Sequence, residues 1–169
     1  VNLVTKRPQF RQGGEIKATY GSWSQKRIEA DVQSVAGSTE NVGVRLVGFY
    51  EDAESFRDTV ETERFGFYPS VTWEASADTT VTYELEYTEQ KIPFDRGVVA
   101  IDGKLGHQPI ETFTGDPNGD TIDTEVVGHQ IEISHKLADE WNLLLGAGLR
   151  DTTFEGNALE NNFDGRQTL

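Results

Sequence analysis

Seven separate stretches of this sequence alternate between apolar and polar side chains with a period of two residues. Such alternation is typical of β-strands, because successive side chains of a strand point to opposite faces of a sheet. The stretches are 14–23, 27–35, 42–50, 64–73, 80–89, 127–137 and 141–150. No stretch shows helical periodicity of comparable quality. The sequence therefore predicts an all-β fold.

The connections between these stretches are of two kinds, and the two kinds alternate along the chain. Short links follow the second, fourth and sixth stretches, at 37–41, 76–79 and 138–140. Longer links follow the third and fifth stretches, at about 52–61 and 92–124, and the short link 22–25 falls at the same end. In an antiparallel up-and-down meander, all the long links would then lie at one end. Transmembrane β-barrels of the outer membrane have this asymmetry, whereas a soluble sandwich has no reason to adopt it.

The composition is compatible with a membrane barrel, although at first sight it suggests a soluble acidic protein. The chain has 169 residues, a formal net charge of −14 and no cysteine. It contains no apolar run long enough for a transmembrane helix. A barrel alternates lipid-facing and lumen-facing residues, so its average hydropathy resembles that of a soluble protein. The acidic balance argues against a nucleic-acid partner, because phosphate binding needs clustered lysine and arginine.

The two predicted faces differ in the way that a barrel wall requires. One face carries charged residues such as Arg27, Glu29, Asp31, Glu84 and Glu86, which would face water or a polar lumen. The other face is apolar and ends in aromatic residues, which suit the interfaces of a membrane. These aromatic residues are Tyr20, Trp23, Tyr50, Trp73 and Trp141.

Two histidines, His129 and His135, fall on the predicted apolar face and weakly contradict this interpretation. Either they lie near the interfaces, or the assignment of faces in that strand is wrong. They lie six residues apart on one strand, so a metal site built from these two alone is not expected.

The first eight residues form a separate feature. Residues 1–5 resemble a strand, which Pro8 would end because proline has no backbone N–H to pair. The intervening basic pair, Lys6 and Arg7, is interpreted as no more than a solubilising boundary. Seven strands would leave unpaired edges, since the smallest membrane barrels use eight. We therefore expect the chain to be a piece of a larger protein.

The motif VNLVTKRP at 1–8 resembles the end of the plug domain in TonB-dependent outer-membrane siderophore receptors. The motifs YGSWSQKR, GFYEDAESFRD, PSVTWEASADTTVTYELEY and PFDRGVVAIDGKLG resemble the first barrel hairpins and the start of a long loop, in family order. The segment 115–152 resembles the hairpin after that loop. The resemblance implies that residues 1–8 close the plug. Residues 9–169 would then be the N-terminal portion of a 22-stranded barrel.

The same resemblance implies a function for the whole protein. It would be an outer-membrane receptor of a Gram-negative bacterium that imports ferric siderophores. Energy would come from the TonB protein, through a TonB box that this sequence lacks. The expected partners are a ferric siderophore, TonB and outer-membrane lipid. Such transport involves no covalent chemistry, so we expect no enzyme activity, no catalytic residues, no resident cofactor and no metal site.

Three residues in the predicted long-loop end are candidate ligand contacts: Trp23, Phe94 and Arg96. Loops carry binding functions disproportionately, and arginine binds planar oxyanions well. The alternatives are that Trp23 belongs to the aromatic girdle and that Asp95 pairs locally with Arg96. The segment 115–125 partly matches a calcium loop, but a solvated turn is the better interpretation.

Two rival functions remain open at the level of sequence. The chain could belong to another outer-membrane β-barrel, such as a porin or a barrel enzyme, although porins have no plug strand to end. It could instead be a soluble carbohydrate-binding β-sandwich. The segregation of loop lengths and the aromatic residues at the strand ends count against the sandwich.

Overall fold

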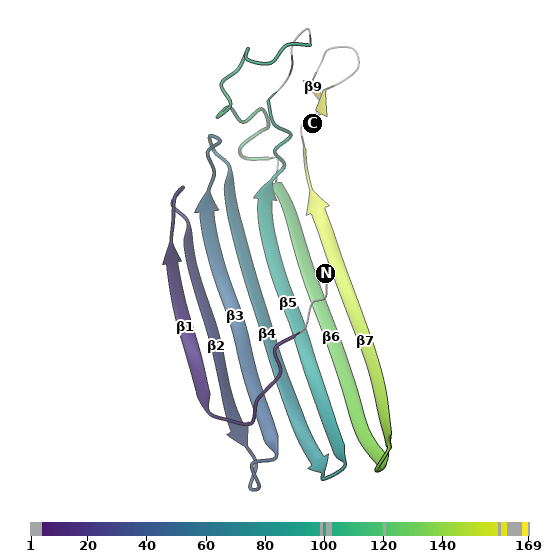
Figure 1. Cartoon of the computed structure of the whole chain (residues 1–169). Coiled ribbons are helices and arrows are strands. Elements are labelled where there is room, and N and C mark those ends of the chain that lie inside the picture. The colour runs from purple at the N-terminus through teal and green to yellow at the C-terminus, as the bar shows by residue number, and fades with distance from the viewer. Residues whose placement is uncertain are drawn as a thin grey trace.

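Strands β1 to β7 form one antiparallel sheet in the computed structural model, and they follow one another in chain order across it (Figure 1). The structure describes residues 5–98, 100, 103–119, 121–158, 160–161 and 167–168. Within these residues no helix is present. The predicted strand at 1–5 therefore lies outside the described residues, apart from Thr5.

The strands become longer after the first two. They are β1 (Gly13–Tyr20), β2 (Lys26–Ala36), β3 (Val42–Glu54), β4 (Glu61–Ser76), β5 (Thr79–Pro93), β6 (Thr121–Ala138) and β7 (Trp141–Gly156). A separate two-stranded ladder pairs β8 (Glu160–Asn161) with β9 (Gln167–Thr168). The predicted all-β antiparallel meander of seven strands is confirmed.

The short and long connections lie at opposite ends of the sheet, as predicted. The tight turns after β2, β4 and β6 gather at one end, which we call the turn end (Figure 1). The links after β1, β3 and β5 lie at the other end, which we call the loop end. Strands β2 to β7 reach further toward the loop end than predicted. For example, β6 begins at Thr121 rather than at residue 127.

At the loop end β1 is shorter than the alternating stretch 14–23, because it stops at Tyr20. Residues 22–25 form a short link, as predicted. The amide of Gly21 donates to the carbonyl of Gln25 at 2.9 Å, which closes a tight turn. Trp23 lies inside this turn with φ 59°, a left-handed conformation that no strand can hold.

The register of the ladders brings apolar residues from all seven strands together on one face. Ile16 pairs with Ala30, Val71 pairs with Tyr83, and Ile133 pairs with Leu145. Pairing in an antiparallel sheet places the two partners on the same face, so these side chains form a continuous apolar face. Its members are highly accessible: 73% of Ile16 and 54% of Leu145 is exposed.

A belt of charged residues limits the apolar face at the loop end. On each of β2 to β7, the next same-face position beyond the apolar run is charged: Lys26, Asp52, Glu63, Glu89, Glu125 and Asp151. The apolar run on β4 extends from Phe65 to Trp73. That length is close to the 9–11 residues with which a tilted strand crosses a bilayer.

In an ordinary soluble domain apolar side chains are buried and polar side chains are exposed, and this sheet shows the reverse. Among the described residues, the buried apolar side chains are Val60 and Val126 of the sheet and its links, together with Pro8 before β1. The buried polar and charged residues all lie on the opposite, polar face of the sheet: Glu51, Ser70, Thr72, Thr82 and Glu84. The fold therefore has no hydrophobic core, and its apolar surface faces outward.

A proline lies inside the sheet. Pro69 occupies the middle of β4, a position that proline normally avoids because it cannot donate to a ladder. It pairs with Leu46 of β3. The β4–β5 ladder is interrupted at this point, since its pairs run from Phe67 directly to Ser70.

The structure settles the position of the two histidines. The ladders pair His129 with Leu85 and His135 with Thr79, so both side chains share the apolar face and the predicted face of this strand was right. Each imidazole has a polar partner. The Nδ1 atom of His129 lies 2.7 Å from the hydroxyl of Tyr83, and that of His135 lies 2.8 Å from the hydroxyl of Thr79. Among the described residues no helix is long and apolar enough to cross a membrane.

Candidate functional site

Residues 5–10, which we call the strap, cross the polar face of the sheet before β1 begins (Figure 1). Close packing at Gly43 allows this crossing. A Cβ atom at this glycine would lie only 2.7 Å from the Cβ atom of Pro8. The backbone of the strap is also held, because the hydroxyl of Ser70 donates to the carbonyl of Lys6 at 3.4 Å.

Arg7 binds two glutamates, Glu84 and Glu132, that lie diagonally across the β5–β6 ladder on the polar face. Its Nη1 atom lies 2.6 Å from Glu132, and its Nη2 atom lies 3.1 Å from the other oxygen of the same carboxylate. Such a two-pronged contact fits the planar guanidinium group. Nη2 also lies 3.4 Å from Glu84. The hydrogen bond to Glu132 raises the pKa of Arg7 above its ordinary value, so the residue stays charged.

Lys6 and Arg45 bind a second carboxylate on the same face. Arg45 donates to both oxygens of Asp31 at 2.7 Å, and the ammonium group of Lys6 lies 2.8 Å from one of them. Arg45 also donates to the backbone carbonyl of Arg7 at 3.0 Å. The interpretation of the basic pair as a mere solubilising boundary was therefore wrong, because both residues fasten the strap to the sheet.

This contact network was missed because a sequence does not show which distant carboxylates a basic pair will meet. Arg7 and Glu132 are 125 positions apart. The signal that was available is the alternation itself, which places Glu84, Glu132 and Asp31 on the polar face. A basic pair next to a polar face rich in carboxylates indicates docking of that segment.

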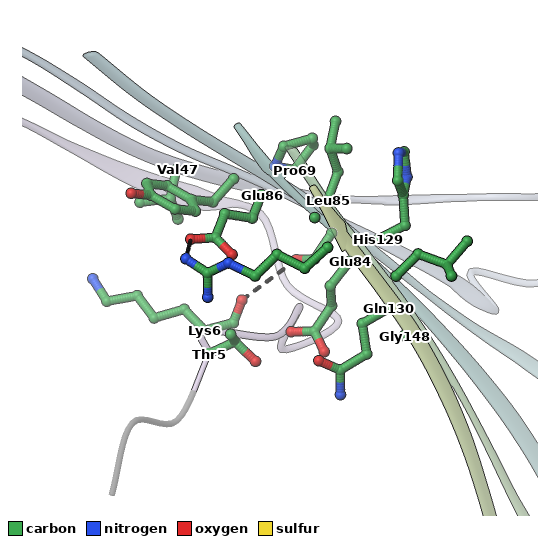
Figure 2. Close-up of a pocket in the computed structure, with 15 residues that line it drawn as sticks. Thr5, Lys6, Val47, Pro69, Glu84, Leu85, Glu86, His129, Gln130 and Gly148 are labelled. Atoms are coloured by element: carbon green, nitrogen blue, oxygen red, sulfur yellow. Dashed lines mark hydrogen bonds and ion pairs between the residues drawn. The ribbon is translucent and has the colours of Figure 1, made fainter. Parts of the chain in front are cut away.

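The strap and the polar face enclose a pocket of about 600 Å³ (Figure 2). The strap contributes Thr5 and Lys6, and strands β3 to β7 contribute the opposite lining. In Figure 2 the carboxylate of Glu84 lies beside the amide of Gln130, its partner in the ladder. One oxygen of Glu84 is buried without a hydrogen-bond partner among the described residues.

A second group of contacts lies at the loop end, where three links meet. Trp23 of the β1–β2 turn packs edge-on against Phe56 of the β3–β4 link, with ring centroids 6.5 Å apart. The amide of Glu54 donates to the carbonyl of Trp23 at 2.9 Å. Trp23 is therefore part of the loops, and both its role as a ligand contact and the alternative of a girdle position stay predictions.

Arg57 joins the β3–β4 link to the long β5–β6 link. Its Nε atom lies 2.6 Å from the carboxylate of Asp95. Its Nη1 atom donates to the carbonyls of Ile110 and Thr112 at 2.9 and 3.1 Å. Asp95 thus forms its ion pair with Arg57 of another link, and not with its neighbour Arg96 as the alternative interpretation expected.

Phe94 and Arg96 flank Asp95 and lie close to each other. The guanidinium carbon of Arg96 lies 4.8 Å from the centroid of the Phe94 ring, a cation–π geometry. Phe94 also lines a second pocket at the loop end, together with Phe154. The structure therefore brings Phe94 and Arg96 together and connects both to Trp23 through Asp95, Arg57 and Phe56.

The acidic segment after residue 115 forms a turn in the part that is described. The amide of Asn118 donates to the carboxylate of Asp116 at 2.9 Å, which is the geometry of an Asx turn. The resemblance to a calcium loop depends on the spacing of Asp116, Asn118 and Asp120, and Asp120 lies outside the described residues. Within the described chain no cluster of three or more histidine, aspartate or glutamate residues is arranged to hold a metal ion.

Comparison with known proteins identifies the family. No family model matches the chain. The metal-pseudopaline receptor of Pseudomonas aeruginosa is 32% identical over 161 residues, which cover 95% of this chain and 23% of the receptor. The ferrioxamine B receptor of Salmonella typhimurium is 28% identical over 153 residues, covering 85% of this chain and 21% of that receptor. The chain belongs to the family of TonB-dependent outer-membrane siderophore receptors.

Solved structures of receptors show the same fold. The pyoverdine outer-membrane receptor of Pseudomonas aeruginosa matches 94% of this chain and 24% of its own with a TM-score of 0.83 and 19% identity. The ferric preacinetobactin receptor of Acinetobacter baumannii matches with a TM-score of 0.79 and 22% identity, and the match covers 94% of this chain and 24% of the receptor chain. The chain thus spans about a quarter of the length of the relatives that it matches.

The comparisons bear on the rival functions, because the four relatives reported above are all named as receptors. A porin, a barrel enzyme and a soluble carbohydrate-binding sandwich all disagree with this set.

Proposed function

We propose that the protein containing this chain is an outer-membrane receptor for the TonB-dependent uptake of ferric siderophores. The observation that carries the proposal is the combination of an outward apolar face with a basic strap docked on the polar face. A barrel wall explains the first feature, and a plug that fills the lumen explains the second. The homology to siderophore receptors supports both.

In this proposal residues 1–8 are the C-terminal end of the plug, and residues 9–169 are the first part of the barrel. The strap supports this division, because it lies on the lumen face and leads into β1. TonB and the rest of the plug would act through segments outside this chain. Outer-membrane lipid would cover the apolar face between the charged belt and the turn end.

The ligand surface in this proposal is the loop end, with Trp23, Phe94 and Arg96 as contacts. Aromatic rings and an arginine suit a bulky metal chelate with oxygen donors, since arginine recognises oxygen acceptors and aromatic rings supply rigid contact area. Phe94 and Arg96 lie together, and the Trp23 ring is in contact with the same group of links. No resident cofactor is proposed, because the metal arrives and leaves with its chelator.

The transported chelate is one of a small number of classes. The relatives are named for metal-pseudopaline, ferrioxamine and pyoverdine, which differ chemically. The greatest identity among the relatives reported above is to the metal-pseudopaline receptor. A chelate of a metal other than iron is therefore a second candidate substrate.

Uptake by the full-length protein tests the proposal. A strain that lacks its own receptors would express the complete gene and receive radiolabelled iron as the ferrioxamine B or pyoverdine complex, or labelled metal as the pseudopaline complex. We expect uptake of at least one chelate, and its loss in a strain without TonB. The variants Trp23→Ala, Phe94→Ala and Arg96→Ala should weaken binding of that chelate. Uptake that persists without TonB would contradict the proposal and favour a passive channel.

A further inference from the structure

We propose that Arg57 is the positioning residue of the extracellular ligand surface, and that it holds the β5–β6 link in a form ready to bind. The inference rests on the proposed function, because that function assigns ligand contact to Phe94 and Arg96. The inference goes beyond that function by naming a residue that need not touch the ligand. Mutation of Arg57 would weaken ligand binding by releasing the β5–β6 link.

The guanidinium of Arg57 contacts the long link at two separate places. It binds the carboxylate of Asp95 at the start of the link and the carbonyls of Ile110 and Thr112 some fifteen residues later. The planar fork of arginine presents several donors at fixed angles, which suits acceptors on different segments. Lysine carries a single ammonium group and cannot reproduce this arrangement.

Neighbouring hydrogen bonds strengthen the same junction. The amide of Asp58 donates to the carbonyl of Glu111 at 2.7 Å. The carboxylate of Asp95 also accepts from the amide of Gly97 at 2.8 Å, and the hydroxyl of Thr114 donates to the carbonyl of Gly97 at 3.2 Å. Two distant parts of the link are therefore joined to each other and to the β3–β4 link.

The burial of this ion pair distinguishes it from an ordinary surface contact. Only 11% of the Arg57 side chain and 24% of the Asp95 side chain is exposed, although both lie in links between strands. A charge removed from water must be compensated by partners, so removal of either one leaves the other poorly solvated. Exposed loop ion pairs contribute little, whereas this one is expected to fix the loop.

The junction controls the candidate ligand residues directly. Asp95 lies between Phe94 and Arg96, so a fixed Asp95 carboxylate also fixes the backbone that carries both. On its other side, the Arg57 guanidinium lies 5.2 Å from the centroid of the Phe56 ring, which packs against Trp23. All three proposed contact residues are thus oriented through one side chain.

The test uses the full-length receptor in detergent micelles and compares Arg57→Lys with a matched control, Arg64→Lys. Arg64 also makes an ion pair, to Glu51 at 3.7 Å, but it lies on β4 and 45% of its side chain is exposed. Amide hydrogen exchange is measured for peptides from 94–119. Affinity is measured for whichever ferric complex of ferrioxamine B or pyoverdine binds the unmodified receptor.

We expect Arg57→Lys to speed exchange in 94–119 by about tenfold or more, while the strands keep their protection. The affinity should fall by about tenfold, and Arg64→Lys should leave exchange of the link unchanged. Phe94→Ala provides the contrast, because it should weaken binding without speeding exchange. In Arg57→Gly, millimolar guanidinium ion should restore protection where sodium does not.

Unchanged exchange in Arg57→Lys would overturn the inference, as would faster exchange without any loss of affinity. If Arg57→Lys releases the link but neither ferric complex binds the unmodified receptor, the loop-holding role stands and the assignment of ligand is what fails. If the complexes bind and Arg57 has no effect, the proposed function stands without this inference.

Discussion

At the scale of single residues, arginines on the polar face and in the links decide how separate segments are joined. Arg7 fastens the strap to Glu132, and Arg57 fastens the long link to Asp95. Both use several donors of one guanidinium group, which explains why arginine rather than lysine occupies these positions. Lys6, in contrast, is 62% exposed and contacts one carboxylate.

Replacement of Arg7 by glutamine should destabilise the full-length protein because it leaves Glu132 and Glu84 without their cation. Since 39% of the Arg7 side chain is exposed, solvent screens part of the loss, and we expect about 1–2 kcal/mol. The matched control Lys6→Gln should cost less than about 0.5 kcal/mol. Urea denaturation in micelles measures both, and equal effects of the two substitutions would argue against a special role for Arg7.

Gly43 provides a second prediction at this scale. A Cβ atom there would approach Pro8 too closely, so Gly43→Ala should displace the strap and cost about 1–3 kcal/mol. Gly146→Ala is the control, because a Cβ atom there meets only the carbonyl oxygen of Ile131 at 3.8 Å. Protease cleavage within residues 5–10 of the folded receptor would report the displacement. Equal resistance of both variants to cleavage would show that the strap tolerates the methyl group.

At the scale of elements, each strand in the proposed barrel has one lipid-facing and one lumen-facing side. The ladder register assigns a side chain to one of these sides more clearly than its exposed fraction does. Leu144 and Leu145 are adjacent in β7 and are both exposed, at 64% and 54%. Leu145 pairs with Ile133 on the apolar face, and Leu144 pairs with Ser134 on the polar face. Exposure alone does not separate them, but the register does.

Arginine at these two positions should therefore have different effects. Leu145→Arg places a charge on the lipid side of the wall and should cost about 2–4 kcal/mol near the bilayer middle. Leu144→Arg faces the lumen side and should cost much less. Folding of the full-length protein into lipid vesicles, followed by urea titration, measures the difference. If both variants lose the same stability, the assignment of the two faces is incorrect.

At the scale of the whole molecule, the described sheet has the reverse of a soluble core. Most of its apolar surface is exposed, and most of the buried side chains among the described residues are polar. Monomeric soluble proteins rarely expose apolar patches of more than a few hundred square ångströms, so a sheet of this kind needs lipid or another chain to cover it. The outer membrane supplies that cover.

Residues 1–169 expressed alone should consequently aggregate in plain buffer and gain β-structure only when detergent micelles are present. The apolar face drives association in water, whereas micelles cover it. Far-UV circular dichroism and sedimentation, with and without detergent, provide the measurement. A monomer with a sharp thermal transition in buffer would contradict the lipid-facing assignment.

The sequence by itself determined the seven strands, the face that each side chain occupies and the end at which the long links gather. These features depend on local periodicity, because a strand has a period of two wherever it lies. It also led to the candidate contacts Trp23, Phe94 and Arg96, whose role stays a prediction. Strand ends were less accurate: β6, for example, starts at Thr121 rather than at residue 127.

Only the tertiary structure decided which charges meet. The partner of Arg7 is 125 residues away on β6, and Asp95 binds Arg57 on another link rather than its neighbour Arg96. Ion pairs of this kind depend on the register of several ladders and on the path of the strap and the loops. Alternation places a carboxylate on a face, but only the folded arrangement places a particular cation within reach of it.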